Sequence, residues 1–214
     1  RSLLLGSGVS ICGASAVAAV DAVIQADEED VAFSIGAITL FGTVYMFCYP
    51  VLYNLFHIPD KFYALWAGSS IHEVAQVAAA STVAIGKFKE MATYVKMIRV
   101  LFIIPLTLIL SFIPLNSYKG DRIEKAQKRK VTIPWFAILF FLMVVVNTLF
   151  KLPANLAKGL ITFDNVILTA SMGGLGLDIS FRSMKNIGAK AFALGIISSL
   201  FISVITGIVI KLII

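Results

Sequence analysis

Long apolar stretches recur along the chain, and short polar connectors separate them. A membrane-spanning helix needs about 20 predominantly apolar residues. Residues 135–146 and 195–210 show no alternation of apolar and polar positions, which disfavours a β-barrel. The pattern predicts an all-α fold, a polytopic membrane helical bundle with seven transmembrane segments, at residues 2–24, 31–55, 62–85, 92–115, 133–150, 159–178 and 189–214.

Composition leads to the same class of protein. The 214 residues are 59% hydrophobic and 14% charged, and the mean hydropathy is +0.93, whereas soluble domains carry about 25% charged residues. A soluble fold of this length could not cover so much apolar surface. The net charge of +6 is concentrated in connectors rather than interleaved with aromatic residues, which argues against nucleic-acid binding.

The connectors predict the orientation of the segments. Residues 116–130 hold six lysines and arginines, so this loop is expected on the cytoplasmic side. If every segment crosses the membrane, residues 181–188 lie on the same side as this loop. The acidic connector at residues 25–30 then lies on the opposite side, and Lys87 and Lys89 lie with it.

Two segments are unusually rich in glycine and serine, residues 6–16 and 169–178. Both residue types lower helix stability and can leave backbone N–H and C=O groups free. Paired glycine-interrupted segments in two halves of a chain indicate the binding site of an inverted-repeat transporter, although small residues also permit close helix packing. We expect interruptions within residues 6–15 and 171–176 that approach each other near the bilayer centre.

The third segment carries ionisable side chains, which are costly inside a bilayer. On a continuous helix Ser69, His72 and Gln76 would share one stripe, with Glu73 beside Gln76. Histidine titrates near physiological pH, so His72, Glu73 and Gln76 are candidates for proton coupling, with Asp178 as a further candidate. The alternative is a structural hydrogen-bond cluster between helices.

Other residues predict no catalytic centre. Position 76 is glutamine, so the His-Glu-x-x-His zinc motif is absent, as are the phosphate-binding loop and the serine-nucleophile motif. Cys12 and Cys48 lie in apolar segments without metal-ligand spacing. Lys96 and Arg99 are expected to snorkel to the membrane surface, or else to attract an anion. We predict no enzyme activity, no metal and no cofactor.

Several runs resemble the YeiH-type family of bacterial membrane proteins, which is assigned to sulfate export. The similarity covers essentially the whole chain. It lies in residues 8–16 (Gly-Val-Ser-Ile-Cys-Gly-Ala-Ser-Ala), 40–43 with Tyr49-Pro50, 68–79 (Gly-Ser-Ser-Ile-His-Glu-Val-Ala-Gln-Val-Ala-Ala), 96–100, 132–139 and 173–177. Residues 171–177 depart from the family pattern by additional glycines, which predict a looser helix.

The resemblance implies a fold similar to the bile-acid, arsenite and riboflavin transporter superfamily, with two inverted five-helix repeats and two broken crossing helices. Residues 1–55 would then be the last two helices of repeat one, as a fragment, and residues 62–214 would form repeat two. Family members are longer, with about four helices before the position of Arg1. The resemblance also implies the bacterial cytoplasmic (inner) membrane.

Together these observations predict a secondary transporter of a small anion such as sulfate, working by alternating access and coupled to protons. A sodium-coupled organic-anion transporter and a membrane receptor or scaffold without flux remain alternatives. The expected partners are the lipid bilayer, the anion and H⁺ or Na⁺, with a homodimer left open. Free N–H groups at half-helix N-termini would bind the anion, and the candidate residues are Ser7, Ser10, Cys12, Gly13, Ser15, Ser171, Gly173, Gly174 and Gly176.

Overall fold

The computed structural model describes residues 2–112, 135–150, 153–178 and 189–214, and these residues contain helices and no strand. The loops at residues 116–130 and 181–188, on which the orientation prediction depended, lie outside the described residues. The helices are α1 (Ser2–Ser10), α2 (Ala14–Ile24), α3 (Glu28–Phe56), α4 (Asp60–Ser70), α5 (Val74–Ala80), the 3₁₀ turn Ser81–Val83, α6 (Phe88–Leu101), α7 (Ile103–Phe112), α8 (Trp135–Leu149), α9 (Ala154–Asp178) and α11 (Ala189–Ile213).

The helical membrane class predicted from the sequence is confirmed, but the count of seven spans is not. Within the part of the chain that the structure describes, three helical stretches are long and apolar enough to cross a membrane, at Glu28–Phe56, Phe88–Phe112 and Phe192–Ile213. The second of these joins α6 and α7 through Phe102. Large apolar side chains such as Phe47, Phe201 and Leu212 are exposed on these helices, as expected for surfaces that face lipid.

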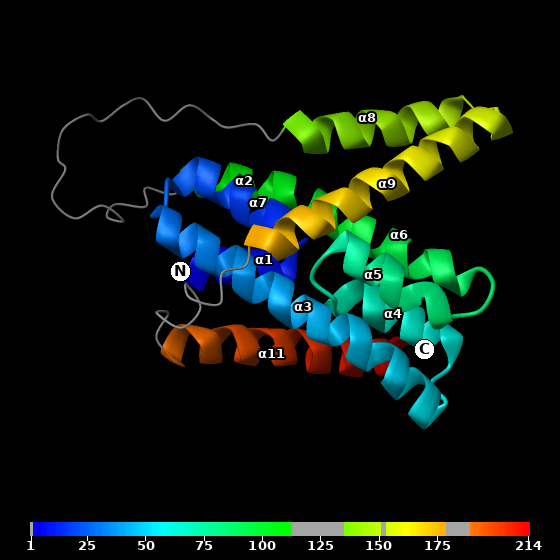
Figure 1. Cartoon of the computed structure of the whole chain (residues 1–214), viewed down its shortest axis with the longest axis horizontal. Coiled ribbons are helices and arrows are strands. Elements are labelled where there is room, and N and C mark those ends of the chain that lie inside the picture. The colour runs from blue at the N-terminus through cyan, green and yellow to red at the C-terminus, as the bar shows by residue number, and fades with distance from the viewer. Residues whose placement is uncertain (1, 113–134, 151–152, 179–188) are drawn as a thin grey trace, which may run out of the picture.

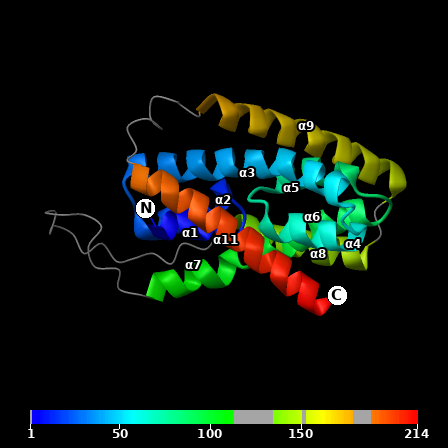
Figure 2. The same cartoon turned by 90° about the horizontal axis from the view of Figure 1, so that it is seen from below.

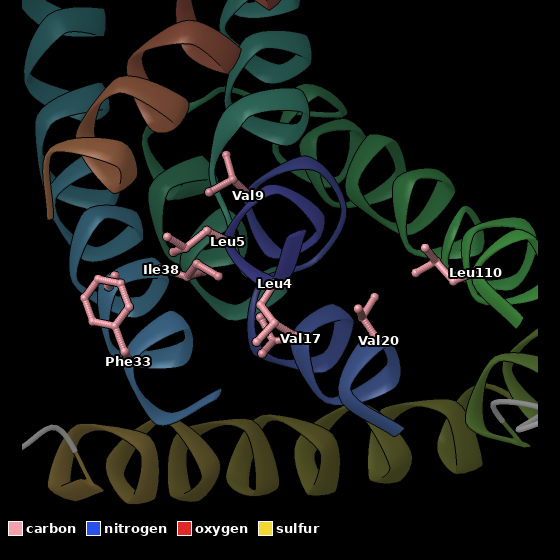
Figure 3. Packing of buried hydrophobic residues seen from close by; sticks show 9 residues of the cluster. Leu4, Leu5, Val9, Val17, Val20, Phe33, Ile38 and Leu110 are labelled. Carbon is pink, nitrogen blue, oxygen red and sulfur yellow. The ribbon is translucent and has the colours of Figure 1, made fainter. Parts of the chain in front are cut away.

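The first predicted span does not cross the molecule. It folds back as hairpin 1, residues 2–24, in which α1 and α2 pack against each other. The start of α1 and the start of α3, which follows α2, lie at the same end of the molecule (Figures 1 and 2). Figure 3 shows Leu4 of α1 close to Val17 of α2 and Leu5 beside Ile38 of α3, in one buried cluster with Val20, Phe33 and Leu110.

The third predicted span is also a hairpin, which enters from the other end. Hairpin 2 comprises residues 60–83, and the Tyr63 hydroxyl of α4 donates to the Ala80 carbonyl at 2.7 Å. At its base the Ile85 amide donates to Asp60 Oδ1 at 3.3 Å. The long helix α3 lies between the two hairpins in sequence and runs from one end of the molecule to the other (Figures 1 and 2).

The expected interruption at residues 171–176 is wrong. Helix α9 continues from Ala154 to Asp178, and Gly173 and Gly174 are exposed, with no neighbour where a Cβ would stand. Glycine lowers helix propensity by about 1 kcal/mol but removes no backbone hydrogen bond. An interruption inside a membrane protein also needs other groups to bind the freed backbone, and such groups are present at the hairpin tips.

Candidate functional site

Tip 1, residues 11–13, separates α1 from α2 and confirms the interruption expected within residues 6–15. Gly13 has φ 76° and ψ −132°, a conformation that glycine adopts at little cost. The Ile11 amide donates to the Ser7 carbonyl at 3.0 Å, and the Gly13 amide donates to the Gly8 carbonyl at 2.9 Å. The chain therefore turns sharply while most of its local backbone bonds persist.

Tip 2, residues 71–73, separates α4 from α5 by extended backbone, with φ −65° and ψ 142° at Ile71 and φ −113° and ψ 151° at Glu73. The helical stripe expected for Ser69, His72 and Gln76 is therefore wrong. No glycine lies in this tip. The signal that could have found it is a repeat, because Gly8-Val-Ser-Ile11 and Gly68-Ser-Ser-Ile71 stand 60 positions apart.

Lys96 of α6 joins the two tips. Its Nζ donates to the Ile11 carbonyl and to the Ile71 carbonyl, each at 2.8 Å. The side chain is 0% exposed, so the snorkelling predicted for Lys96 is wrong. A buried ammonium needs hydrogen-bonding partners in place of water, and the two freed carbonyls supply them.

Arg99, one turn further along α6, binds backbone carbonyls at the C-terminal ends of α1 and α4. Its guanidinium donates to the carbonyls of Val9 and Ser10 in hairpin 1 and of Gly68 and Ser69 in hairpin 2, at 2.5 to 3.4 Å. The last carbonyls of a helix lack partners and carry partial negative charge. Arg99 and Lys96 thus cap the C-terminal ends of α1 and α4, which leaves no guanidinium N–H pattern suited to an anion.

Glu73 links tip 2 to the start of α2 and to α3. Its carboxylate accepts the Ala14 backbone N–H and the Thr39 hydroxyl, the latter at 3.2 Å. A Cβ on Gly13 would stand 2.5 Å from Glu73 Cγ, so glycine at this position makes room for the acid. The half-helix N-terminus that was expected to bind the anion is therefore occupied by a side chain of the protein.

Gln76 anchors hairpin 2 to α3. Its Nε2 donates to the Thr39 carbonyl at 3.1 Å and to Thr43 Oγ1 at 3.3 Å, while its Oε1 accepts the Glu73 amide at 3.3 Å. Gly42 of α3 leaves the space that this amide occupies. Because its amide group donates to α3 and accepts from the Glu73 backbone, Gln76 positions Glu73. A glutamine amide does not ionise, so Gln76 cannot itself take up or release a coupling proton.

His72 points toward a different set of neighbours from Glu73. Its Nε2 lies 3.0 Å from Ser199 Oγ of α11, and its ring centroid is 5.7 Å from that of Tyr45 of α3. The histidine is 0% exposed. The structure thus places the two expected coupling residues side by side in the chain but in separate hydrogen-bond environments.

The remaining candidate residues do not form one site. In hairpin 1, Ser7 Oγ donates to the Leu4 carbonyl at 2.9 Å, and Cys12 Sγ lies 2.8 Å from Ser15 Oγ. Ser10 is exposed and contributes its carbonyl to Arg99. Within the described residues, no group of three or more His, Cys, Asp or Glu side chains is placed to hold a metal ion.

The candidates in the sixth segment lie on α9, whose continuous helix ends at Asp178. They are Ser171, Gly173, Gly174, Gly176 and Asp178. None of them belongs to either hairpin tip, and the side chains of Ser171 and Asp178 lie outside the described ones. The assignment of these five residues to the binding or coupling site therefore stays a prediction without support from the fold.

Apolar helices long enough to span a bilayer, with large apolar side chains exposed on them, indicate a polytopic membrane protein. Unwound backbone at membrane depth is tolerated only inside protein or a wet cavity, which agrees with the buried position of the two tips. A family model described as Conserved hypothetical protein 698 matches residues 1–195. A UPF0324 membrane protein of Yersinia pestis is 40% identical over 212 residues, which cover 96% of this chain and 58% of the relative. The chain belongs to this UPF0324 family.

Other relatives agree with this membership. A UPF0324 membrane protein of Staphylococcus aureus (strain COL) is 35% identical over 209 residues, covering 98% of this chain and 62% of the relative. The UPF0324 inner membrane protein YeiH of Escherichia coli (strain K12) is 35% identical over 199 residues, covering 92% and 56%. No solved structure matches. The chain spans about three-fifths of the length of these relatives. The family and the inner-membrane localisation predicted from the sequence are confirmed.

Proposed function

We propose that the chain is the hairpin-bearing part of a secondary transporter that moves a small anion, such as sulfate, across the bacterial cytoplasmic membrane by alternating access. The observation that supports this most directly is the meeting of the two hairpin tips, which Lys96 joins through the Ile11 and Ile71 carbonyls. Non-helical backbone near the centre of paired, inverted segments is typical of transporter binding sites.

The arrangement of helices supports an inverted repeat. We propose that residues 2–56 and 60–112 are its two units, each a hairpin followed by a long helix, with α2 and α5 beginning 60 positions apart, as do α3 and α6. Helix α2 packs against α7 of the second unit, and α5 packs against α3 of the first. The second unit is therefore shorter than the five-helix repeat expected at residues 62–214.

Glu73 is our candidate for proton coupling. As a carboxylate it accepts bonds from the start of α2 and from Thr39, which ties both tips to α3. Protonation converts one oxygen into a donor and weakens its charge-assisted bond to the helix N-terminus. A proton would thereby loosen the contact between the hairpins, which is the movement that alternating access requires.

The contacts favour protons over the alternative of sodium coupling. Sodium would need free backbone oxygens, yet Lys96 and Arg99 already bind the carbonyls at the ends of α1 and α4. A receptor or scaffold without flux would have no need for unwound backbone between its hairpins. Proton-coupled transport therefore accounts for both the broken backbone and the buried acid.

Flux measurements on the protein purified from membranes and reconstituted in liposomes test this function. Wild-type protein should carry at least one of radiolabelled sulfate, phosphate or succinate, faster when a pH gradient is imposed. Glu73→Gln, which keeps an acceptor for Ala14, should fold normally and transport without dependence on the gradient. The matched control Glu90→Gln, at an exposed position, should behave as wild type.

Three results would count against the proposal. Absence of flux for every anion in wild-type protein would favour the receptor or scaffold. A requirement for a sodium gradient would favour the sodium-coupled alternative. Full dependence on the pH gradient in a well-folded Glu73→Gln protein would remove Glu73 from the mechanism while leaving transport itself in place.

A further inference from the structure

Two buried polar atoms lie on adjoining rings between α3, tip 2 and α11. They are Tyr45 Oη and His72 Nδ1, and neither has a hydrogen-bond partner among the described residues. Their ring centroids are 5.7 Å apart. Because buried polar groups in native proteins are nearly always hydrogen-bonded, two such atoms on neighbouring side chains point to a ligand.

The bond on the other side of the His72 ring allows Nδ1 to act as a donor. Ser199 Oγ lies 3.0 Å from Nε2, and a serine hydroxyl can donate to that nitrogen. The neutral ring then carries its proton on Nδ1. A tyrosine hydroxyl is likewise a donor at neutral pH. The two free groups can therefore present two N–H or O–H donors to one acceptor.

The surrounding charge favours a negative acceptor. Lys96 and Arg99 both act electrostatically on His72, and both are committed to backbone carbonyls. They supply a positive field without competing for the ligand as donors. An oxyanion oxygen satisfies this combination better than a neutral amide or a cation does.

Neighbouring side chains hold Tyr45 and His72 in place. Tyr45 stacks on Tyr49 with centroids 5.2 Å apart, and Tyr49 stacks on Trp66 at 4.0 Å. The Tyr49 hydroxyl is bonded to Ser70 at 2.8 Å and to Ser203 at 2.7 Å. This aromatic column connects α3, α4 and α11, so movement of hairpin 2 would change the position of both donors.

We propose that the Tyr45 hydroxyl and His72 Nδ1–H form the oxyanion-binding subsite of the transporter. This inference rests on the proposed anion transport and moves the substrate from the half-helix N-termini, where Glu73 already lies, to the side of tip 2 that faces α3 and α11. It also changes the role of His72 from proton coupling to substrate recognition. Both atoms are shielded from solvent, so the ligand enters when the hairpins part.

The test is the concentration dependence of flux in liposomes for whichever of sulfate, phosphate or succinate the wild-type protein carries. Tyr45→Phe removes one donor. His72→Gln removes Nδ1 but keeps an amide near Nε2 for Ser199. Each should raise KM about 10- to 100-fold, the effect of losing a hydrogen bond to a charged group, with kcat little changed.

Two further variants separate recognition from packing. His72→Asn keeps a donor near Nδ1 and loses the bond to Ser199, so its KM should rise less than that of His72→Gln. Tyr53→Phe, the matched control on the same helix, should lower thermal stability through the lost bond from its hydroxyl to Asp60 while KM stays near wild type. Equal KM in wild type, Tyr45→Phe and His72→Gln would overturn the subsite and leave anion transport standing. A larger KM change in His72→Asn than in His72→Gln would also overturn it, and wild-type protein without flux would remove the proposed function first.

Discussion

At the scale of single residues, the chemistry of the two tips is complementary rather than duplicated. Tip 1 reads Ile-Cys-Gly and tip 2 reads Ile-His-Glu. Gly13, with φ 76°, faces the Glu73 side chain. One tip therefore supplies the ionisable group, and the other supplies the space and the Ala14 N–H that receive it. The third position of each tip therefore differs, with glycine in tip 1 and glutamate in tip 2.

Gly13→Ala should destabilise the protein by about 3 kcal/mol, because the added Cβ requires an unfavourable backbone conformation and collides with Glu73. Gly36→Ala is the matched control, since Gly36 lies in α3 with no atom within 4 Å of the added Cβ. It should be neutral or stabilising by about 0.5–1 kcal/mol. Denaturation of both variants in detergent measures the difference in stability. Equal stabilities would contradict the conclusion that Gly13 leaves space for the Glu73 side chain.

At the scale of elements, one helix secures both hairpins. Helix α6 carries Lys96 and Arg99, and these cations contact carbonyls at the ends of α1 and α4. Two helix ends of the same polarity meet there, so their partial negative charges would repel each other without a cation between them. Helix α6 therefore stabilises the meeting of the two hairpins.

Lys96→Met should lower the free energy of unfolding by about 3 kcal/mol, because it leaves two buried carbonyls without a charged donor. The exposed Lys89→Met change on the same helix removes the same charge without these bonds and should have little effect. Unfolding of both variants in the same detergent provides the comparison. A Lys96→Met protein as stable as Lys89→Met would show that the ammonium does not hold the tips.

At the scale of the whole molecule, the hairpins change the expected orientation. If residues 2–24 and 62–85 crossed the membrane, the connectors near Glu29 and Lys87 would lie on one side. In the structure each hairpin returns to the end from which it entered, so of the elements between these two connectors α3 is the one that runs from one end of the molecule to the other (Figures 1 and 2). We therefore expect the two connectors to lie on opposite sides of the membrane.

Cysteine labelling in intact cells distinguishes the two topologies. In a background without Cys12 and Cys48, Glu29→Cys and Lys87→Cys place single thiols at exposed positions. We expect an impermeant reagent to label only one of them, and His57→Cys to behave like Lys87→Cys. Labelling of Glu29→Cys and Lys87→Cys from the same side would restore the orientation derived from seven spans.

The sequence by itself determined that this protein lies in a lipid bilayer and that it is helical. The abundance of apolar residues requires a bilayer, and backbone groups in lipid require helices. The interruption in residues 6–15 was also predictable, because Gly13 stands in the middle of an apolar segment and glycine adopts positive φ at little cost. His72 and Glu73 were recognisable as candidate site residues, because ionisable side chains are costly inside a bilayer.

Only the tertiary structure decided where the second interruption falls and which helices reverse direction. Residues 71–73 contain no residue that breaks a helix, whereas the glycine-rich residues 171–176 remain helical. Unwound backbone is stable where distant groups bind its freed carbonyls and amides, and here Lys96, Arg99 and Glu73 do so. Those contacts join positions 25 to 90 residues apart, so local propensity does not encode them.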